Sequence, residues 1–368
     1  RSSMDQIQLK DFIGFKYISG LKASPKKQSF AYVVSYANLD DNKYVSDLYI
    51  SDGKTKKKLI HLKANTEFLW ESEHSILFKY QKNKKEEKDV KELKKTIYYR
   101  YHLIDRTYEK AYEFMMPLSI LHVLPNQRLV LTSFLENDAF EGYHLDDEKR
   151  KAFLKKEKQN ALYEDISEMP FYFNGEGFIA HKRKKLFLYD DHTKELEKMH
   201  HDALNVQQTR LDVEQNKLYL SAQHIKDMRT HTHEIYVYDF DQKRLDSVFN
   251  DPTFSISSMY LLGSEVLVAA HDQKPYGLNQ NPDFYIVKNK QLILLSHFQK
   301  SLGNSIGSDA RLYGNPQDDV FHEELYFVST VDDHSELLKL NLKGELEEVV
   351  SFKGSLDGFI TLNERFYG

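Results

Sequence analysis

Short apolar runs, rich in aromatic and β-branched residues, recur along the chain, and each is followed by a polar turn and another apolar run. Six of these runs can be aligned on one residue each: Tyr49, Tyr98, Phe187, Tyr236, Tyr285 and Leu338. The successive steps are about 49, 89, 49, 49 and 53 residues, and the longest is one period plus roughly 40 inserted residues. A repeat of this length is typical of the blades of a β-propeller.

Each repeat has room for four short strands. In the first repeat, turn signals such as Ser24-Pro25 and Asp52-Gly53 separate the candidate strands. The sequence therefore predicts an all-β fold, a propeller of four-stranded blades. The expected blades cover residues 21–62, 66–114, 119–200, 206–249, 255–298 and 307–352. An α+β protein or a β-sandwich is the alternative, although the regular step is hard to reproduce in either.

Residues 358–366 resemble the opening of a further blade, so the expected architecture is a seven-bladed propeller with a truncated last blade. We expect an artificial cut there, because a natural chain rarely leaves the unpaired edge of a half-built sheet exposed. At the other end, Arg1-Ser2-Ser3 is interpreted as a vector remnant, with Met4 as the natural start.

Two segments interrupt the repeat. Residues 84–95, a run of mixed charge between the second and third strands of blade two, are expected to form a solvated hairpin extension. Residues 136–182 form an insertion in blade three, and residues 146–162 within it are rich in helix formers. A helix there could lie against the propeller face or a neighbouring domain, or it could be a simple surface excursion.

Composition narrows the classes of partner. The 368 residues carry a net charge of -5, which argues against nucleic acid, because phosphate binding needs a basic face. No apolar stretch approaches the length of a membrane span, and no secretory signal opens the chain. The absence of cysteine excludes disulfides, cysteine-ligated zinc and a thiol nucleophile. We therefore expect a cytoplasmic protein with neither nucleic acid nor membrane as a partner.

Motifs for catalysis or metal binding are weak. Residues 303–307, with Ser305 at the centre, match the G-x-S-x-G nucleophile elbow, but no helix pattern follows them, so we interpret the match as coincidental. The histidine groupings His231-Thr232-His233 and His200-His201 lack a recognisable metal-ligand spacing. There is no phosphate-binding glycine loop. The sequence thus predicts no catalytic residue, no cofactor and no metal site.

One segment of the insertion, residues 168–178, concentrates aromatic and acidic side chains beside a turn-forming Asn-Gly pair. Such a loop could line a substrate passage. The alternative is a hydrophobic plug that seals the insertion onto its blade. The residues expected to face a substrate are Glu168, Phe171, Tyr172, Phe173 and Glu176.

The opening of the chain, residues 9–53, resembles the start of acylaminoacyl-peptidase-like members of the prolyl oligopeptidase family of serine peptidases. Residues 31–34 (Ala-Tyr-Val-Val) and 46–49 (Ser-Asp-Leu-Tyr) match strands of the first blade in that family. Ser24-Pro25 matches its turn, although Lys26-Lys27 replaces the usual Asp-Gly. These motifs are individually weak, and their order and spacing carry the resemblance.

The insertion adds to the resemblance, because residues 168–178 (EMPFYFNGEGF) are similar to the insertion loop of bacterial members. The resemblance implies a propeller, here residues 21–368, that precedes a C-terminal α/β-hydrolase domain with the Ser, Asp and His of a triad. That domain is absent from this chain, so no catalytic residue can be carried over. Within an N-terminal helical segment, residues 4–20, residues 10–17 would match a helix that often packs against the hydrolase domain.

The expected function is therefore that of a substrate-gating propeller in a serine peptidase that cleaves oligopeptides or acylated peptides, catalytically inert by itself. Its partners would be the missing hydrolase domain and peptide substrates. The alternative is a free-standing propeller that binds a protein partner through loops at one end. The coding sequence beyond Gly368 would distinguish the two.

Overall fold

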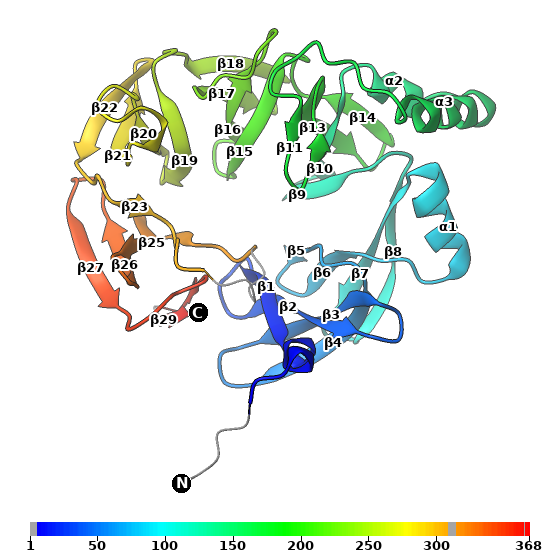
Figure 1. Cartoon of the computed structure of the whole chain (residues 1–368), viewed down its shortest axis with the longest axis horizontal. Helices are drawn as coiled ribbons and strands as arrows, with labels where there is room; N and C mark the ends of the chain where they lie inside the picture. Colours follow the sequence, from blue (N-terminus) through cyan, green and yellow to red (C-terminus); the bar gives the residue numbers. More distant parts are fainter. Residues whose placement is uncertain (1–5, 308–313, 364) are drawn as a thin grey trace.

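The computed structural model describes residues 6–307, 314–363 and 365–368. Six antiparallel sheets stand around a ring and form the blades of a propeller (Figure 1). Five of these sheets have four strands, and the sheet of blade six has five because two short strands share its inner position. The fold is all-β, and the α-helices of the described residues lie in the connections between strands.

Within each blade the strands follow one another in chain order. Blades one and two contain β1 (Lys16–Ala23), β2 (Phe30–Asn38), β3 (Lys43–Ser51), β4 (Lys56–Lys63), β5 (Phe68–Ser72), β6 (Ser75–Lys79), β7 (Thr96–His102) and β8 (Thr107–Phe114). Blades three and four contain β9 (Ser119–Leu124), β10 (Arg128–Glu136), β13 (Lys182–Asp190), β14 (Glu195–Lys198), β15 (Leu204–Asp212), β16 (Lys217–His224), β17 (Glu234–Asp239) and β18 (Arg244–Phe249). Blades five and six contain β19 (Ser255–Leu262), β20 (Glu265–His271), β21 (Asp283–Lys288), β22 (Gln291–Ser296), β23 (Ser301–Leu302), β24 (Asp318–Phe321), β25 (Glu324–Val331), β26 (His334–Leu340) and β27 (Leu346–Ser351).

Equivalent turns in successive blades use the same local chemistry. In the β13–β14 turn the carboxylate of Asp190 accepts hydrogen bonds from the backbone N–H groups of His192 and Thr193. Asp239 caps the β17–β18 turn in the same way, and Lys194 and Lys243 then adopt positive φ values of 61° and 49°. An aspartate that bonds the backbone two residues later favours a tight turn. The turns therefore repeat at the spacing that the sequence pattern indicated.

The hydrophobic core is divided among the boundaries between blades. Blades five and six, for example, meet through Phe284, Phe298 and Phe327, all buried, with ring centroids 5.1 to 5.4 Å apart. Blades two and three meet through a cluster that includes Tyr98 and Phe187. Each strand presents alternate residues to a neighbour, so a blade buries both faces only when it is stacked between two others.

The inner strands are linked from blade to blade by polar side chains. His122 of blade three lies 2.8 Å from the hydroxyl of Thr209 in blade four. Gln208 of blade four accepts the backbone N–H of Met259 in blade five at 2.7 Å. Arg210 lies 3.9 Å from Asp318 and so connects blade four with blade six. These contacts satisfy polar groups that line the centre of the ring.

Between blades six and one the chain adds a two-stranded hairpin, β28 (Ile360–Leu362) and β29 (Arg365–Tyr367), in a sheet of its own. Asn315 donates to the carbonyl of Ile18 at 2.8 Å, and Lys27 pairs with Asp319 at 2.8 Å, so polar contacts join blade six to blade one. The ring of Tyr367 packs 5.4 Å from that of Phe30. The structure shows six blades and this hairpin, and the seventh blade remains a prediction.

The prediction for residues 84–95 was wrong in its type of structure, because Lys84–Leu93 forms an α-helix, α1, between β6 and β7. Asn83 caps its first turn by accepting the N–H of Glu86 at 3.0 Å. Glu86 is buried, where it pairs with Lys110 at 2.7 Å and accepts the hydroxyl of Tyr99. The capping residue and the acidic first turn are ordinary helix signals that the mixed charge obscured.

The N-terminal segment also differs from the expectation. The helix over residues 10–17 is instead a single 3-10 segment, η1 (Leu9–Gly14), followed at Lys16 by β1. Lys16 pairs with Tyr36 of β2, so the sheet begins five residues before residue 21, the predicted start of blade one. The residues from Lys16 onward therefore pair with β2 as a strand and do not form a helix. The proposed vector remnant lies outside the described residues.

Candidate functional site

The insertion of blade three carries the site that the sequence singled out. It contains α2 (Ala139–Tyr143), α3 (Asp147–Asn160) and a small hairpin, β11 (Tyr172–Phe173) and β12 (Gly177–Phe178). The helix expected over residues 146–162 corresponds to α3, which Asp146 caps by accepting the N–H of Lys149 at 3.0 Å. A Cβ at Gly142 would lie 2.4 Å from the Phe153 ring, so this glycine allows α2 and α3 to approach closely.

The hairpin β11–β12 turns through Asn174-Gly175, where Gly175 has a φ of 86°. The rings of Tyr172 and Phe178 meet edge to face at 5.3 Å. Tyr172 and Phe173 are each 53% exposed, and Glu176 is exposed as well. Phe171 is half-buried and stacks on Phe178. Four of the five residues expected to face a substrate therefore lie together on an accessible hairpin.

Glu168 does not lie with them. Its carboxylate is 3% exposed and forms a two-pronged ion pair with Arg183 of β13, at 2.9 and 2.6 Å. The Nε of Arg229 lies 3.4 Å from the same carboxylate. A buried carboxylate paired with two guanidinium groups positions the loop and has no group left for a ligand.

The insertion is fixed to blade four by the connection between β16 and β17. Arg229 donates its backbone N–H to the carbonyl of Met169, and its guanidinium donates to the carbonyls of Ile179 and Lys182. Met169 and Met228 form a parallel backbone bridge. The hairpin is thus held at both ends by contacts with the β16–β17 connection, while its aromatic tip stays exposed.

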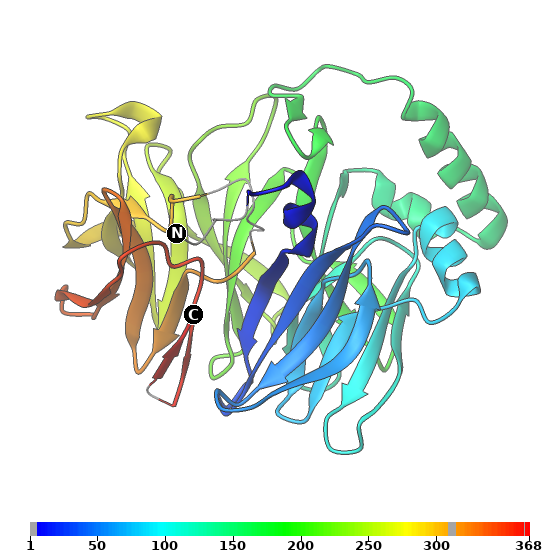
Figure 2. The same ribbon diagram turned by 60° about the horizontal axis from the view of Figure 1, so that its bottom comes forward.

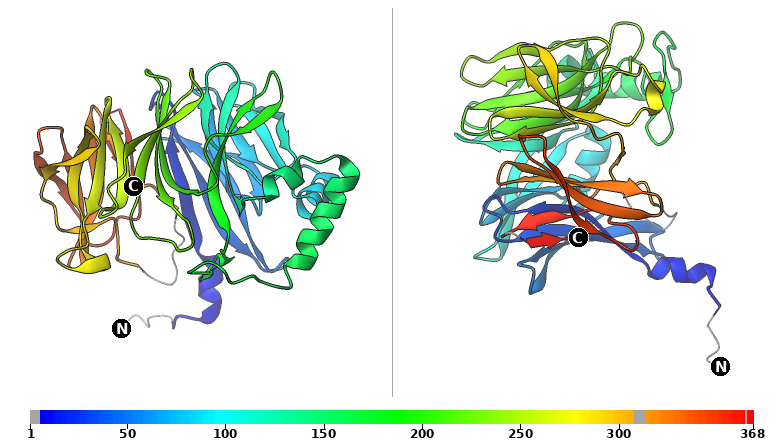
Figure 3. Two further views of the ribbon diagram at one scale, coloured as in Figure 1. Left: turned by 90° about the horizontal axis from the view of Figure 1, so that it is seen from above. Right: turned by 90° about the vertical axis from the view of Figure 1, so that its left-hand side faces the viewer.

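One end of the ring gathers exposed apolar side chains. Figure 2 and Figure 3 show that η1, the β11–β12 hairpin, α3 and η2 (Gly277–Asn279) lie at this end. We call it the insertion face. Large apolar side chains exposed on these elements and the segments beside them are Leu9, Phe12, Phe15, Leu162, Tyr163, Ile166, Met169, Tyr172, Phe173, Phe178, Tyr276 and Leu278. A monomeric protein rarely exposes so many large apolar groups at one end, so this face is a candidate interface.

The G-x-S-x-G match lies after β23 in an irregular segment. The backbone N–H of Ser305 donates to the hydroxyl of Thr330 at 2.9 Å, and Asn304 donates to Asp357 at 2.9 Å. Residues 308–313, which follow the match, lie outside the described residues. In the described part of the chain no histidine or carboxylate is hydrogen-bonded to the Ser305 hydroxyl. This geometry differs from the strand-to-helix turn of a nucleophile elbow.

The two histidine groupings have structural roles. Burial lowers the pKa of His200 to about 4, and its Nε2 accepts the backbone N–H of Leu186 at 2.9 Å. Burial, helped by the charges of His231 and His271, lowers the pKa of His233 to about 4, and its Nδ1 accepts the N–H of Ile256. Among the described residues no group of three histidine, aspartate or glutamate side chains is placed to hold a metal ion. No described helix has the length and apolar character to cross a membrane.

Neither Arg183 nor Arg229 was among the candidate residues, although both position the loop. A sequence signal exists for Arg183, since it shares the alternating positions of its strand with Phe187 and Tyr189, although Lys185, also charged and buried, lies on the same face. No signal pointed to Arg229, which belongs to another blade.

The fold places the protein in the class of β-propellers, with an insertion that decorates one end. No family model matches the sequence, and no curated protein matches it. The uncomplexed acylaminoacyl peptidase of Pyrococcus horikoshii has a similar structure, with a TM-score of 0.63 and 16% identity over 96% of this chain and 49% of that chain.

Two further solved structures are similar to this chain. An acylaminoacyl peptidase in complex with Z-Gly-Gly-Phe-chloromethyl ketone gives a TM-score of 0.61 and 17% identity over 95% of this chain and 48% of that chain. The propeller domain of the Trilobed protease from Pyrococcus furiosus, described as having an open velcro topology, gives a TM-score of 0.54. The identity is 15%, over 94% of this chain and 86% of that chain. This chain therefore has the fold of the propeller domains of such peptidases, and it spans about half the length of the acylaminoacyl peptidases.

Proposed function

We propose that this chain is the propeller part of a serine peptidase and controls the entry of peptides to a hydrolase domain. The observation that carries the proposal is the insertion face, where the exposed apolar groups of η1 and the β11–β12 hairpin offer a surface for a second domain. Similarity to peptidases of about twice this length supports it. A cytoplasmic location and oligopeptide or acylated-peptide substrates belong to the same proposal.

In this role the ring acts as a barrier and the aromatic tip of the insertion narrows the approach to the second domain. Tyr172 and Phe173 offer apolar contacts to peptide side chains, and Glu176 offers an acceptor for a cationic group. Glu168 and Arg183 hold the hairpin in place and do not contact the peptide. Size selection then follows from the width of the passage and requires no catalytic group in the propeller.

The test begins with the reading frame that encodes the chain. If a region with a nucleophile elbow and a triad follows Gly368, the joined enzyme is compared with a variant in which residues 171–178 are replaced by a short Gly-Ser linker. Gating predicts that the variant cleaves longer peptides faster while its rate on a dipeptide-sized chromogenic substrate changes little. Equal length dependence in both enzymes would contradict gating, and a frame that ends near Gly368 would favour the free-standing binding propeller.

A further inference from the structure

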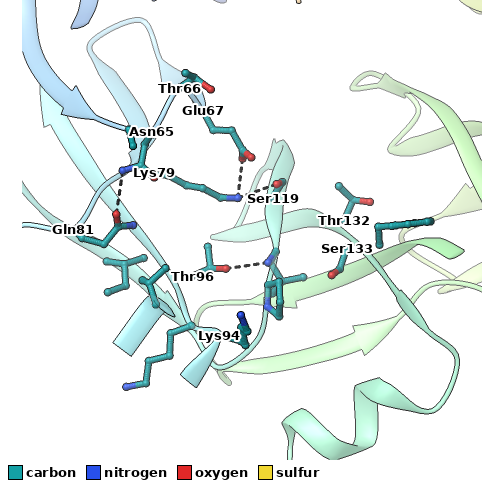
Figure 4. Close-up of a pocket in the computed structure, with 17 residues that line it drawn as sticks. Asn65, Thr66, Glu67, Lys79, Gln81, Lys94, Thr96, Ser119, Thr132 and Ser133 are labelled. Atoms are coloured by element: carbon teal, nitrogen blue, oxygen red, sulfur yellow. Dashed lines mark hydrogen bonds and ion pairs between the residues drawn. The ribbon is translucent and has the colours of Figure 1, made fainter. Parts of the chain in front are cut away.

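A second site lies between blades two and three. A pocket of about 480 Å³ opens beside helix α1, and Figure 4 shows the side chains that line it. Its walls come from the β4–β5 connection, the end of β6, helix α1 and the residues after it, the start of β7, the segment that leads into β9, and the middle of β10. Apolar residues of the lining include Ile97, Leu118 and Phe134. A pocket of this volume can hold a few residues of a peptide.

Cationic side chains outnumber acids in the lining. Lys79, Lys94 and Lys95 accompany a single acid, Glu67. The ammonium group of Lys79 lies 3.0 Å from Glu67 and 3.1 Å from the hydroxyl of Ser119, as Figure 4 shows. Lys95 is paired with two acids that do not line the pocket. Lys94 has no ion pair within the described part of the chain, so its charge is available to a ligand.

A further cation lies directly behind the wall. Arg150 of α3 is 3% exposed, and its guanidinium donates to the carbonyls of Leu93 and Met115. Leu93 precedes Lys94 of the lining directly, and Met115 precedes Pro117 of the lining by two residues. No carboxylate of the described residues lies within ion-pair distance of this guanidinium. A buried positive charge without a counter-ion raises the electrostatic potential around it and favours an anion in the adjoining space.

The lining also offers a free hydrogen-bond donor. Ser133 of β10 is 7% exposed, lines the pocket, and its hydroxyl has no hydrogen-bond partner among the described residues. The neighbouring Thr132 hydroxyl, in contrast, donates to the carbonyl of Lys185 at 2.9 Å. The Ser133 oxygen retains contact with solvent within the pocket, so a ligand acceptor would take the place of water as its partner.

We propose that this pocket binds a carboxylate of a peptide, either its free C-terminal carboxyl group or an acidic side chain. Lys94 supplies unpaired positive charge, and Lys79, which is paired with Glu67, supplies a further donor. Ser133 supplies a hydrogen bond, and Phe134 offers contact to a neighbouring apolar side chain. The choice of a peptide as the ligand rests on the proposed function. The anion preference rests on the pocket itself and is measured on this chain alone, without any hydrolysis.

The experiment is a calorimetric titration of the chain at low salt with four peptides. Acetyl-Ala-Leu-Phe with a free carboxyl group is compared with its C-terminal amide, and acetyl-Ala-Glu-Phe-amide is compared with acetyl-Ala-Gln-Phe-amide. A charge-assisted hydrogen bond in such a pocket corresponds to a preference of about tenfold for the charged member of a pair. The pair that shows the preference identifies the source of the carboxylate, and 0.5 M salt should weaken it because exposed lysines are screened.

Two variants place the effect in the pocket. Lys94→Gln should abolish most of the tenfold preference. Lys91→Gln, which changes an exposed lysine of α1 outside the lining, should retain it. Lys79→Gln serves as an independent second variant, and unchanged thermal unfolding shows that each protein is folded. Equal affinity for the charged and neutral peptides overturns the proposal. So does a preference that survives both Lys94→Gln and Lys79→Gln.

Discussion

Replacing Glu168 with glutamine tests the idea that a buried ion pair holds the insertion in place. Glu168→Gln keeps the shape of the side chain and removes the only carboxylate that contacts Arg183 and Arg229 within the described residues. Both guanidinium groups then remain partly or fully buried without a counter-ion. Breaking a buried pair by removing one partner costs about 3–5 kcal/mol.

The cost should appear first as local opening, because lifting the insertion returns Arg183 to water. The population of the open form therefore rises by roughly a hundredfold or more for about 3 kcal/mol. The segment from residue 168 to residue 182 contains amides protected by this closure, such as the N–H of Ile179, which donates to the carbonyl of Phe171 at 2.9 Å. Native-state hydrogen exchange followed by mass spectrometry measures the change directly.

Two controls separate the pair from its surroundings. Glu176→Gln removes an exposed acid from the same insertion and should leave the exchange of residues 168–182 unchanged. The double variant Glu168→Met with Arg183→Met removes the closest pair and leaves Arg229 without a counter-ion, so it should recover part of the protection that Glu168→Gln loses. If hydrogen exchange in Glu168→Gln accelerates by less than about threefold, far below the expected factor, the reasoning is refuted.

Three further predictions concern packing, pH and chemistry. Phe284→Ala should lower the free energy of unfolding by about 3–5 kcal/mol in urea titrations, against a small change for the exposed Ile293→Ala. The folded-state pKa of His233 is about 4, below its usual value of 6.5, so its stabilising contribution is complete above pH 6.5 and is lost as the pH falls toward 4. Between pH 7 and pH 4 the free energy of unfolding of the parent protein should therefore fall by about 3 kcal/mol more than that of His233→Gln, as measured by urea unfolding. The chain should not hydrolyse acyl-aminoacyl or peptidyl chromogenic substrates, and an activity that Ser305→Ala abolishes would contradict this.

Much of the architecture could be predicted because it is encoded locally. A strand that is buried on both sides between neighbouring blades needs apolar or aromatic residues at regular positions, and its turns need residues such as Asp190 and Asp239. Both signals repeat with the blade, so the step of about 49 residues and the position of the insertion were readable from the chain. Helix α1 was also encoded locally, because Asn83 caps the N–H of Glu86, but the mixed charge of the segment obscured this capping signal.

The candidate site was predicted only in part. The aromatic residues of the β11–β12 hairpin are neighbours in sequence, so their grouping was visible before the structure was known. The role of Glu168 could not be predicted, because its partners are Arg183, 15 residues away, and Arg229 in another blade. Glu168 is buried against guanidinium groups because the β16–β17 connection, which carries Arg229, packs beside it.

The sequence by itself determined the repeat, the all-β class and the place of the insertion, because these follow from alternation and turn chemistry within a few residues. Only the tertiary structure decided how the ring is joined, where Asn315 and Lys27 link blade six to blade one across nearly the whole chain length. It also assembled the pocket of Lys79, Lys94 and Ser133 from separate strands and a helix. Contacts of this kind depend on how blades stack in space, and no local pattern specifies them.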